Sequence, residues 1–191
     1  MAKPIIKMAW SGETLPGYSK KHNSRYRILW YYAGTNQYFP YASEPGVAPD
    51  KTMTMEKAER IVDQMYRKDA FSQWLGIEKV TIAAGHCVLR MEVRETMLNG
   101  FGIAHGGISY SLADSALAFA SNSQGRHALS IETSISHTAP LKAGDIITAT
   151  ATEEQCSRRI GLYRVEVRKA DGQLAAIFKG TVYRKSQDWE V

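Results

Sequence analysis

The segment NGFGIAHGGISYSLADSALAFASNS, which spans Asn99–Ser123, is the most informative part of this sequence. Its small and apolar residues surround one carboxylate, Asp114, and no Lys or Arg lies within a helical turn of it. The paired glycines at 106 and 107 predict the start of a long helix, and Gly125 predicts its end. An ionised carboxylate is costly in an apolar setting unless it is paired or functional. The stretch therefore predicts a helix that carries a working acid near its middle.

An amphipathic pattern lies upstream of this helix. Residues 54–75 predict one or two helices, with Thr54 or Asp69 as a cap and Gly76 as the stop. The apolar positions of this segment are Ile61, Met65, Phe71 and Leu75. We expect these side chains to form the buried faces of the helices.

Alternating patterns predict six strands around the central helix. Residues 77–85 and 86–93 read as a hairpin joined at Gly85. Four further strand-like runs, separated by turn residues, cover 128–139, 145–156, 162–170 and 174–184. On a helical wheel, the central helix presents to the sheet the apolar positions Ile108, Leu112, Ala116 and Phe119. Because the strands do not alternate with helices, the order predicts an α+β protein with an antiparallel sheet covered by one helix.

Composition and charge exclude several classes of protein. The chain has 191 residues, enough for one domain with a full core. No apolar run approaches the roughly 20 residues that span a bilayer, so no membrane association is expected. Beyond residue 50 the charge is nearly balanced, with 18 Lys and Arg against 16 Asp and Glu, so no nucleic-acid partner is expected. Cys87 and Cys156 form no metal-ligand cluster and indicate reduced thiols in the cytoplasm.

The run MLNGFGIAHGGISYSLADSALAFASNSQG, residues 97–125, resembles the hotdog-fold thioesterases of the phenylacetic-acid-degradation (PaaI) type. The similarity lies in its Asn-Gly, His-Gly-Gly and Leu-Ala-Asp motifs, and it extends over residues 54–185. Further matches are the turn with Pro140, Gly144 and Asp145, the Gly-x-Tyr at Gly161, and the Phe-x-Gly at Phe178. The resemblance implies a hotdog fold, in which an antiparallel sheet wraps around one long central helix, for a domain covering residues 53–191. It also implies an acyl-CoA thioester hydrolase.

The resemblance assigns roles to five residues of the motif. Asp114 would be the catalytic carboxylate, attacking the thioester or activating water. The backbone N–H of Gly106 would polarise the thioester carbonyl, and glycine lets the backbone approach the acyl group closely. The residues expected to position the loop or the water are Asn99, His105 and Ser130. His86, His127 and His137 are most simply structural or exposed.

The spacing along the predicted helix bears on quaternary structure. Gly106 and Asp114 are eight residues apart, which places them roughly 12 Å apart on one helix. A reacting carbonyl must lie about 3 Å from its donor and close to the attacking atom. One chain is therefore not expected to supply both groups to the same substrate, and the active unit is expected to be a two-fold homodimer. Members of the family that this sequence resembles form such dimers, which often pair again into homotetramers.

Substrate contacts are expected from basic turns and from aromatic side chains of the helix. The residues expected to bind the phosphates of coenzyme A are Arg158, Arg159 and Lys185. Tyr110 and Phe119 are expected to line the acyl pocket. No metal and no cofactor other than the coenzyme A of the substrate are expected. The resemblance suggests phenylacetyl or hydroxylated aromatic acyl groups, and relatives that accept aliphatic chains leave the acyl group open.

The first 52 residues differ from the rest, and three explanations stay open. The first is an extension, atypical of the family, that packs on the main domain, and the second is a flexible arm. The third is that these residues are no part of the natural protein, which would then start at Met53 or Met55. RILWYYA, residues 27–33, predicts one strand, and SEPGVAPDK, residues 43–51, predicts a linker.

The alternative function is a non-catalytic acyl-CoA-binding regulator. In that case the basic, aromatic N-terminal arm would contact DNA or a partner.

Overall fold

The computed structural model describes residues 5–8, 28–32, 37–40 and 54–191. The chain divides into two compact units, residues 1–45 and 46–191. In the first unit, the antiparallel order β1-β2-β3 is formed by β1 (Ile5–Met8), β2 (Ile28–Tyr32) and β3 (Gln37–Pro40). Strand β2 confirms the strand predicted in RILWYYA, whereas β1 and β3, at four residues each, are too short to show a period. The predicted linker and Met53 lie outside the described residues.

The upstream segment of the second unit forms two helices, α1 (Met55–Lys68) and α2 (Ala70–Leu75). Both predicted caps are confirmed, because the Thr54 hydroxyl accepts a hydrogen bond from the Lys57 N–H at 3.1 Å and the Asp69 carboxylate accepts one from the Ser72 N–H at 3.0 Å. The expectation for Phe71 is wrong: its side chain is 53% exposed. The break at Asp69 restarts the helical phase, so α2 does not continue the buried face of α1.

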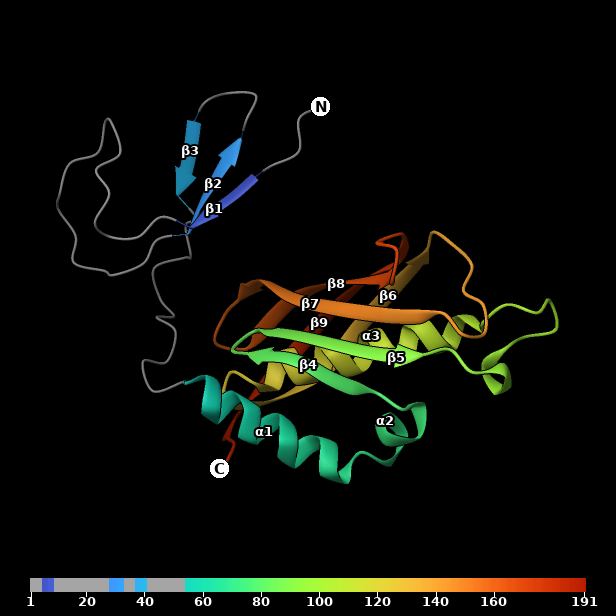
Figure 1. Cartoon of the computed structure of the whole chain (residues 1–191). Helices are drawn as coiled ribbons and strands as arrows, with labels where there is room; N and C mark the ends of the chain where they lie inside the picture. Colours follow the sequence, from blue (N-terminus) through green and yellow to red (C-terminus); the bar gives the residue numbers. More distant parts are fainter. Residues whose placement is uncertain (1–4, 9–27, 33–36, 41–53) are drawn as a thin grey trace, which may run out of the picture. The chain divides into compact units, whose positions relative to one another are not determined.

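The second unit contains a single antiparallel sheet in the order β4-β5-β7-β8-β9-β6 (Figure 1). Its strands are β4 (Glu78–Ala83), β5 (His86–Glu92), β6 (Arg126–His137), β7 (Ile146–Cys156), β8 (Ile160–Lys169) and β9 (Leu174–Asp188). The β4–β5 hairpin turns at Gly85, whose φ is 72°. All six predicted strands are thereby confirmed. Strands β4 and β6 form the two edges of this sheet.

The central helix, α3 (Gly106–Asn122), lies along one face of the sheet, which curves around it (Figure 1). It contacts strands β4 to β9. It begins at Gly106, as predicted, and ends at Asn122, three residues before the predicted stop at Gly125. The predicted sheet-facing positions are confirmed, because Leu112, Ala116 and Phe119 are buried and Ile108 packs against the core. The fold is therefore the hotdog arrangement that the sequence predicts.

Helix α3 packs closely against strand β9 at Gly180, the glycine of the Phe-x-Gly match. A Cβ at this position would lie 3.0 Å from the Leu117 Cδ1 and would overlap its other methyl group. Leu117 is fully buried in the core, so its side chain must shift to admit this Cβ. We expect Gly180→Ala to lower the free energy of unfolding by about 1–3 kcal/mol in urea titrations, because overpacking displaces the helix.

A double-variant cycle tests this cause. In the Leu117→Ala background the overlap disappears, so Gly180→Ala should then cost much less than in the wild-type chain. Gly100→Ala is the matched control, because no atom lies within 4 Å of a Cβ built there. An equal cost of Gly180→Ala in both backgrounds would show that the contact with Leu117 is not its cause.

Candidate active site

The first turn of α3 leaves one backbone donor open. His105 is the N-cap, and its Nδ1 accepts a hydrogen bond from the Gly107 N–H at 3.0 Å. The His105 carbonyl accepts one from the Ile108 N–H at 2.9 Å. Within the part of the chain that is described, the Gly106 N–H donates to no acceptor. Since the helix dipole places partial positive charge here, the Gly106 N–H is available to an anionic ligand atom.

The peptide unit between Gly106 and Gly107 is held at both of its polar ends. Its N–H is bound by His105, and its carbonyl accepts a hydrogen bond from the Ser109 hydroxyl at 3.2 Å. The His137 Nε2 lies 3.0 Å from the Ser109 Oγ and 3.3 Å from the Gly106 carbonyl oxygen. A Cβ at Gly106 would lie 3.2 Å from the His137 ring, so this close approach favours glycine. Two glycines that are flexible by nature are therefore fixed in one conformation.

Asn99 shapes the loop that leads to this turn. Its side-chain oxygen accepts a hydrogen bond from the Phe101 N–H at 2.9 Å, and its own N–H donates to the Ile103 carbonyl at 2.8 Å. The loop is anchored again where the His105 N–H donates to the Met97 carbonyl at 2.9 Å. The Asn99 side chain thus acts on the backbone just before Gly106.

Asp114 lies in the middle of α3 and is half-buried. It forms no hydrogen bond or ion pair with any residue that the structure describes, and burial raises its pKa above the ordinary value of 3.8. It lines a cavity of about 320 Å³ together with Ser130 of β6. Most other lining residues are apolar, among them Leu117, Ala118, Leu129 and Val182. An unpartnered acid in an apolar cavity is a candidate for acid–base or nucleophilic chemistry.

A single chain brings together only part of the predicted site. Asp114 and Ser130 share the cavity, whereas Gly106, Asn99 and His105 are not among its lining residues. Because α3 is one continuous helix, Gly106 and Asp114 stand roughly 12 Å apart along its axis. The two groups therefore lie too far apart to act on the same carbonyl within one chain.

The predicted substrate-binding residues lie away from this cavity. Arg159 donates a hydrogen bond to the Tyr183 hydroxyl at 2.9 Å, and its guanidinium lies over that ring. Arg158 and Lys185 are exposed. All three lie at one end of the sheet, on the β7–β8 turn and near the end of β9.

The two residues predicted to line the acyl pocket lie outside the cavity beside Asp114. Tyr110 is hydrogen-bonded through its hydroxyl to Thr133 and packs edge-on against Phe178, with ring centroids 5.3 Å apart. Phe119 is 1% exposed and lies in the core against Tyr66. Neither lines the cavity beside Asp114.

The residues that sequence analysis missed are His127 and Trp189, which line the cavity beside Asp114, and His137, which contacts the first turn of α3. The one local signal was Trp189, a large aromatic residue among charged ones in the segment SQDWEV. The histidines carry no such signal, since their roles depend on which strand positions the sheet brings to the helix.

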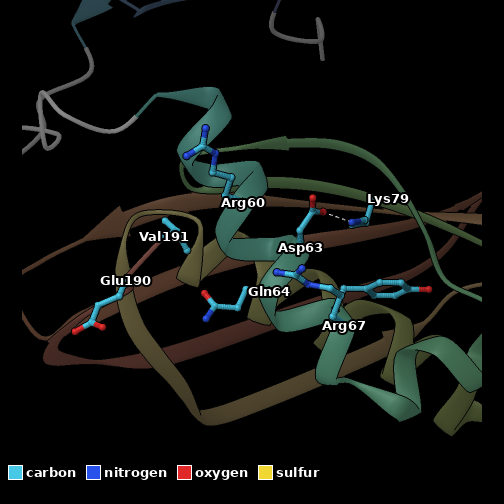
Figure 2. A pocket seen from close by; sticks show the side chains of 8 residues that line it. Arg60, Asp63, Gln64, Arg67, Lys79, Glu190 and Val191 are labelled. Atoms are coloured by element: carbon cyan, nitrogen blue, oxygen red, sulfur yellow. Dashed lines mark hydrogen bonds and ion pairs between the residues drawn. The ribbon is translucent and has the colours of Figure 1, made fainter.

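A second cavity, of about 600 Å³, lies beside α1 (Figure 2). It is lined by both signs of charge, including Arg60, Arg67, Asp63 and Glu190. Asp63 is paired with Lys79, which also lines this cavity, and Arg60 is paired with Glu56 (Figure 2 shows the first pair). Because the carboxylates of Asp63 and Glu190 offset much of the positive charge of the lining, the cavity does not present the strongly positive field that a polyphosphate requires. The candidate active site is therefore the cavity beside Asp114.

These features define a class of hotdog domain. Its central helix carries an acid that pairs with no described residue, and the helix starts with an amide that donates to none of the described acceptors. This combination is suited to thioester hydrolysis. A profile of the thioesterase superfamily matches residues 101–176. The chain is 38% identical to the acyl-coenzyme A thioesterase PaaI of Escherichia coli (strain K12) over 128 residues, which cover 67% of this chain and 91% of that protein. The chain therefore belongs to the thioesterase superfamily, as a hotdog thioesterase of the PaaI type.

Two further comparisons agree with this assignment. A putative esterase of Archaeoglobus fulgidus is 37% identical over 134 residues, which cover 70% of this chain and 87% of that protein. The structure of the E. coli PaaI protein superposes with a TM-score of 0.69 at 36% identity, covering 70% of this chain and 97% of that one. The predicted fold class and family are thereby confirmed. In the described residues, no helix is both long enough and apolar enough to span a membrane.

Proposed function

We propose that this protein hydrolyses acyl-CoA thioesters to a free carboxylate and coenzyme A. Its membership of the thioesterase superfamily and its similarity to an acyl-coenzyme A thioesterase support this function. The observation that carries the proposal is Asp114, a half-buried acid in an apolar cavity that pairs with no described residue. The burial of such a charge is unfavourable, so its presence calls for a functional reason. The reaction requires no metal and no cofactor beyond the coenzyme A of the substrate.

In the proposed mechanism, Asp114 acts either as a general base or as a nucleophile. As a base, it removes a proton from water, whose oxygen forms a bond to the thioester carbon. The raised pKa of Asp114 makes it a stronger base than an exposed carboxylate. As the carbonyl becomes an oxyanion, the Gly106 N–H donates a hydrogen bond to it. The C–S bond then breaks, and the departing thiolate takes the proton from Asp114.

As a nucleophile, the Asp114 carboxylate itself forms the bond to the thioester carbon, and the coenzyme A thiolate leaves. Water then hydrolyses the resulting anhydride and regenerates the carboxylate. In both variants Ser130, which shares the cavity with Asp114, would hold the attacking water. Label found in Asp114 after a single turnover in ¹⁸O-labelled water would show the nucleophilic route, with water attacking the aspartyl carbon of the anhydride. Attack at the acyl carbon labels the product in both routes, so trapping of the anhydride on Asp114 then distinguishes them.

We further propose that each active site is built by two chains, so that a homodimer is the smallest active unit. The separation of roughly 12 Å between Gly106 and Asp114 along α3 supports this. Strand β6 is an edge of the sheet, and its Leu129 and Ile131 side chains are 57% and 60% exposed. An exposed apolar edge strand beside the cavity is suited to two-fold pairing with a second copy. Pairing of two such dimers would give the homotetramer.

Co-expression of two inactive variants tests the shared site. Asp114→Asn chains keep the Gly106 donor, and Gly106→Pro chains keep the acid. In a mixed dimer one of the two sites combines both intact groups, so random mixing should restore about a quarter of wild-type activity. The control is each variant expressed alone, which should show background activity. If each chain contained a whole site, co-expression would restore nothing.

Thiol release from a panel of acyl-CoAs tests the proposed function. We propose phenylacetyl-CoA or a hydroxylated aromatic acyl-CoA as substrate and a role in phenylacetate degradation, since the similar E. coli protein comes from a phenylacetic acid degradation operon. We also propose cytoplasmic action, supported by the two free thiols of Cys87 and Cys156. Tight binding without turnover of any acyl-CoA would instead indicate the non-catalytic regulator.

A further inference from the structure

The segment that follows β9 returns to the C-terminal end of α3 and places Trp189 there. The Trp189 backbone N–H donates a hydrogen bond to the Gly125 carbonyl at 2.8 Å. Its indole N–H donates to the Asn122 side-chain oxygen at 2.9 Å. The indole stacks on the His127 ring, with centroids 4.1 Å apart and planes within 10°. Two hydrogen bonds and one stacking contact therefore fix this side chain.

Asn122 is the residue that joins these elements. Its amide nitrogen donates to the Ala118 carbonyl at 2.9 Å and to the Ala128 carbonyl at 3.0 Å. Its oxygen accepts from the Ala128 N–H at 2.9 Å as well as from the indole of Trp189. Asn122 is 3% exposed, and both of its donors and both acceptor positions of its oxygen are used. A fully satisfied buried amide rigidly ties the last turn of α3, the start of β6 and the Trp189 segment.

Trp189, His127 and Asn122 line the same cavity as Asp114. The lining positions of α3 run from Asp114 to Asn122 along one face of the helix. This places Asn122, and the indole bound to it, roughly 12 Å beyond Asp114 in the direction of the helix C-terminus. The cavity therefore has the acid towards one end and a rigid aromatic pair towards the other.

We propose that Trp189, stacked on His127 and held by Asn122, is the end wall of the acyl pocket and limits the length of the acyl group that is hydrolysed. This inference rests on the proposed function. A thioester carbon at Asp114 directs its acyl group along the apolar lining towards the indole. Acyl groups that end before the indole fit, and longer ones meet a side chain that its contacts prevent from moving aside.

Acyl-chain profiles of the wild-type protein and of Trp189→Ala test the wall. We would measure kcat/KM for phenylacetyl-, butanoyl-, octanoyl-, dodecanoyl- and palmitoyl-CoA. Removal of the indole should raise kcat/KM for the long acyl groups at least about tenfold relative to the short ones. Trp74→Ala is the matched control, because Trp74 is an exposed tryptophan of α2 outside the cavity. It should leave the chain-length profile unchanged.

Two further variants keep the test decisive if Trp189→Ala loses its fold. Trp189→Leu shortens the side chain and should shift the profile part of the way towards long chains. Trp189→Phe keeps a ring but loses the indole N–H, so it should lower the Tm and keep the wild-type preference for length. Folded Trp189→Ala or Trp189→Leu could instead keep the wild-type ranking of substrates, or lose kcat/KM equally for all of them. Either result would contradict the proposal that Trp189 is the end wall of the acyl pocket. Absence of turnover by the wild-type protein would instead overturn the proposed function.

Discussion

Replacement of Asp114 by Asn should lower kcat for acyl-CoA hydrolysis by about 10²- to 10⁴-fold. Asparagine has nearly the same shape as aspartate, so the cavity should persist while the base or nucleophile is lost. Thiol release under saturating acyl-CoA measures the effect, and size-exclusion chromatography confirms the assembly. Asp171→Asn, which changes an exposed acid in the β8–β9 turn, is the matched control and should retain full activity.

The same variant should be at least as stable as the wild-type protein at neutral pH. Burial raises the pKa of Asp114 in the folded state above 3.8, so this group weakens the folded state progressively as pH rises from the unfolded pKa through the folded pKa. Asparagine carries no charge and avoids this loss. The Tm of Asp114→Asn relative to wild type should therefore be higher at pH 7 than at pH 4. A variant that is inactive and also much less stable at pH 7 would indicate a structural acid rather than a catalytic one.

Gly106→Pro should lower kcat by about 10²- to 10³-fold, the effect of removing one oxyanion donor. Proline is well tolerated at the first position of a helix, where its missing N–H has no helical partner. The preceding residue, His105, already has φ −58° and ψ 136°, the extended conformation that proline requires before it. The substitution should therefore remove the N–H with little change to the backbone, and KM should change less than kcat.

Gly106→Ala is the matched control for this substitution. It places a Cβ against the same His137 ring, 3.2 Å away, but keeps the backbone N–H. We expect a much smaller loss of kcat than in Gly106→Pro, so that the difference between the variants reports the N–H itself. Equal losses in both would attribute the effect to crowding at His137, and full activity of Gly106→Pro would exclude the Gly106 N–H as the donor.

The sequence alone determined the elements of the second unit and their order. Thr54 and Asp69 cap their helices as predicted, and Gly85 turns its hairpin. Each of these signals acts over a few residues, because a cap or a turn is satisfied by atoms close in the chain. The spacing of Gly106 and Asp114 along one helix is local in the same sense. For this reason the sequence by itself already predicts a site shared between two chains.

Only the tertiary structure decided which side chains surround Asp114. His127 and Trp189 lie 62 residues apart in sequence and stack because β6 and the segment after β9 meet at the end of α3. Phe119, an expected pocket residue, lies in the core instead, and Phe71, an expected core residue, is exposed. Local sequence patterns predict the face of a helix or strand on which a side chain lies, but they do not predict which residues of other elements pack against that face. The contents of a cavity depend on contacts between distant segments, and these form only when the sheet curves around the helix.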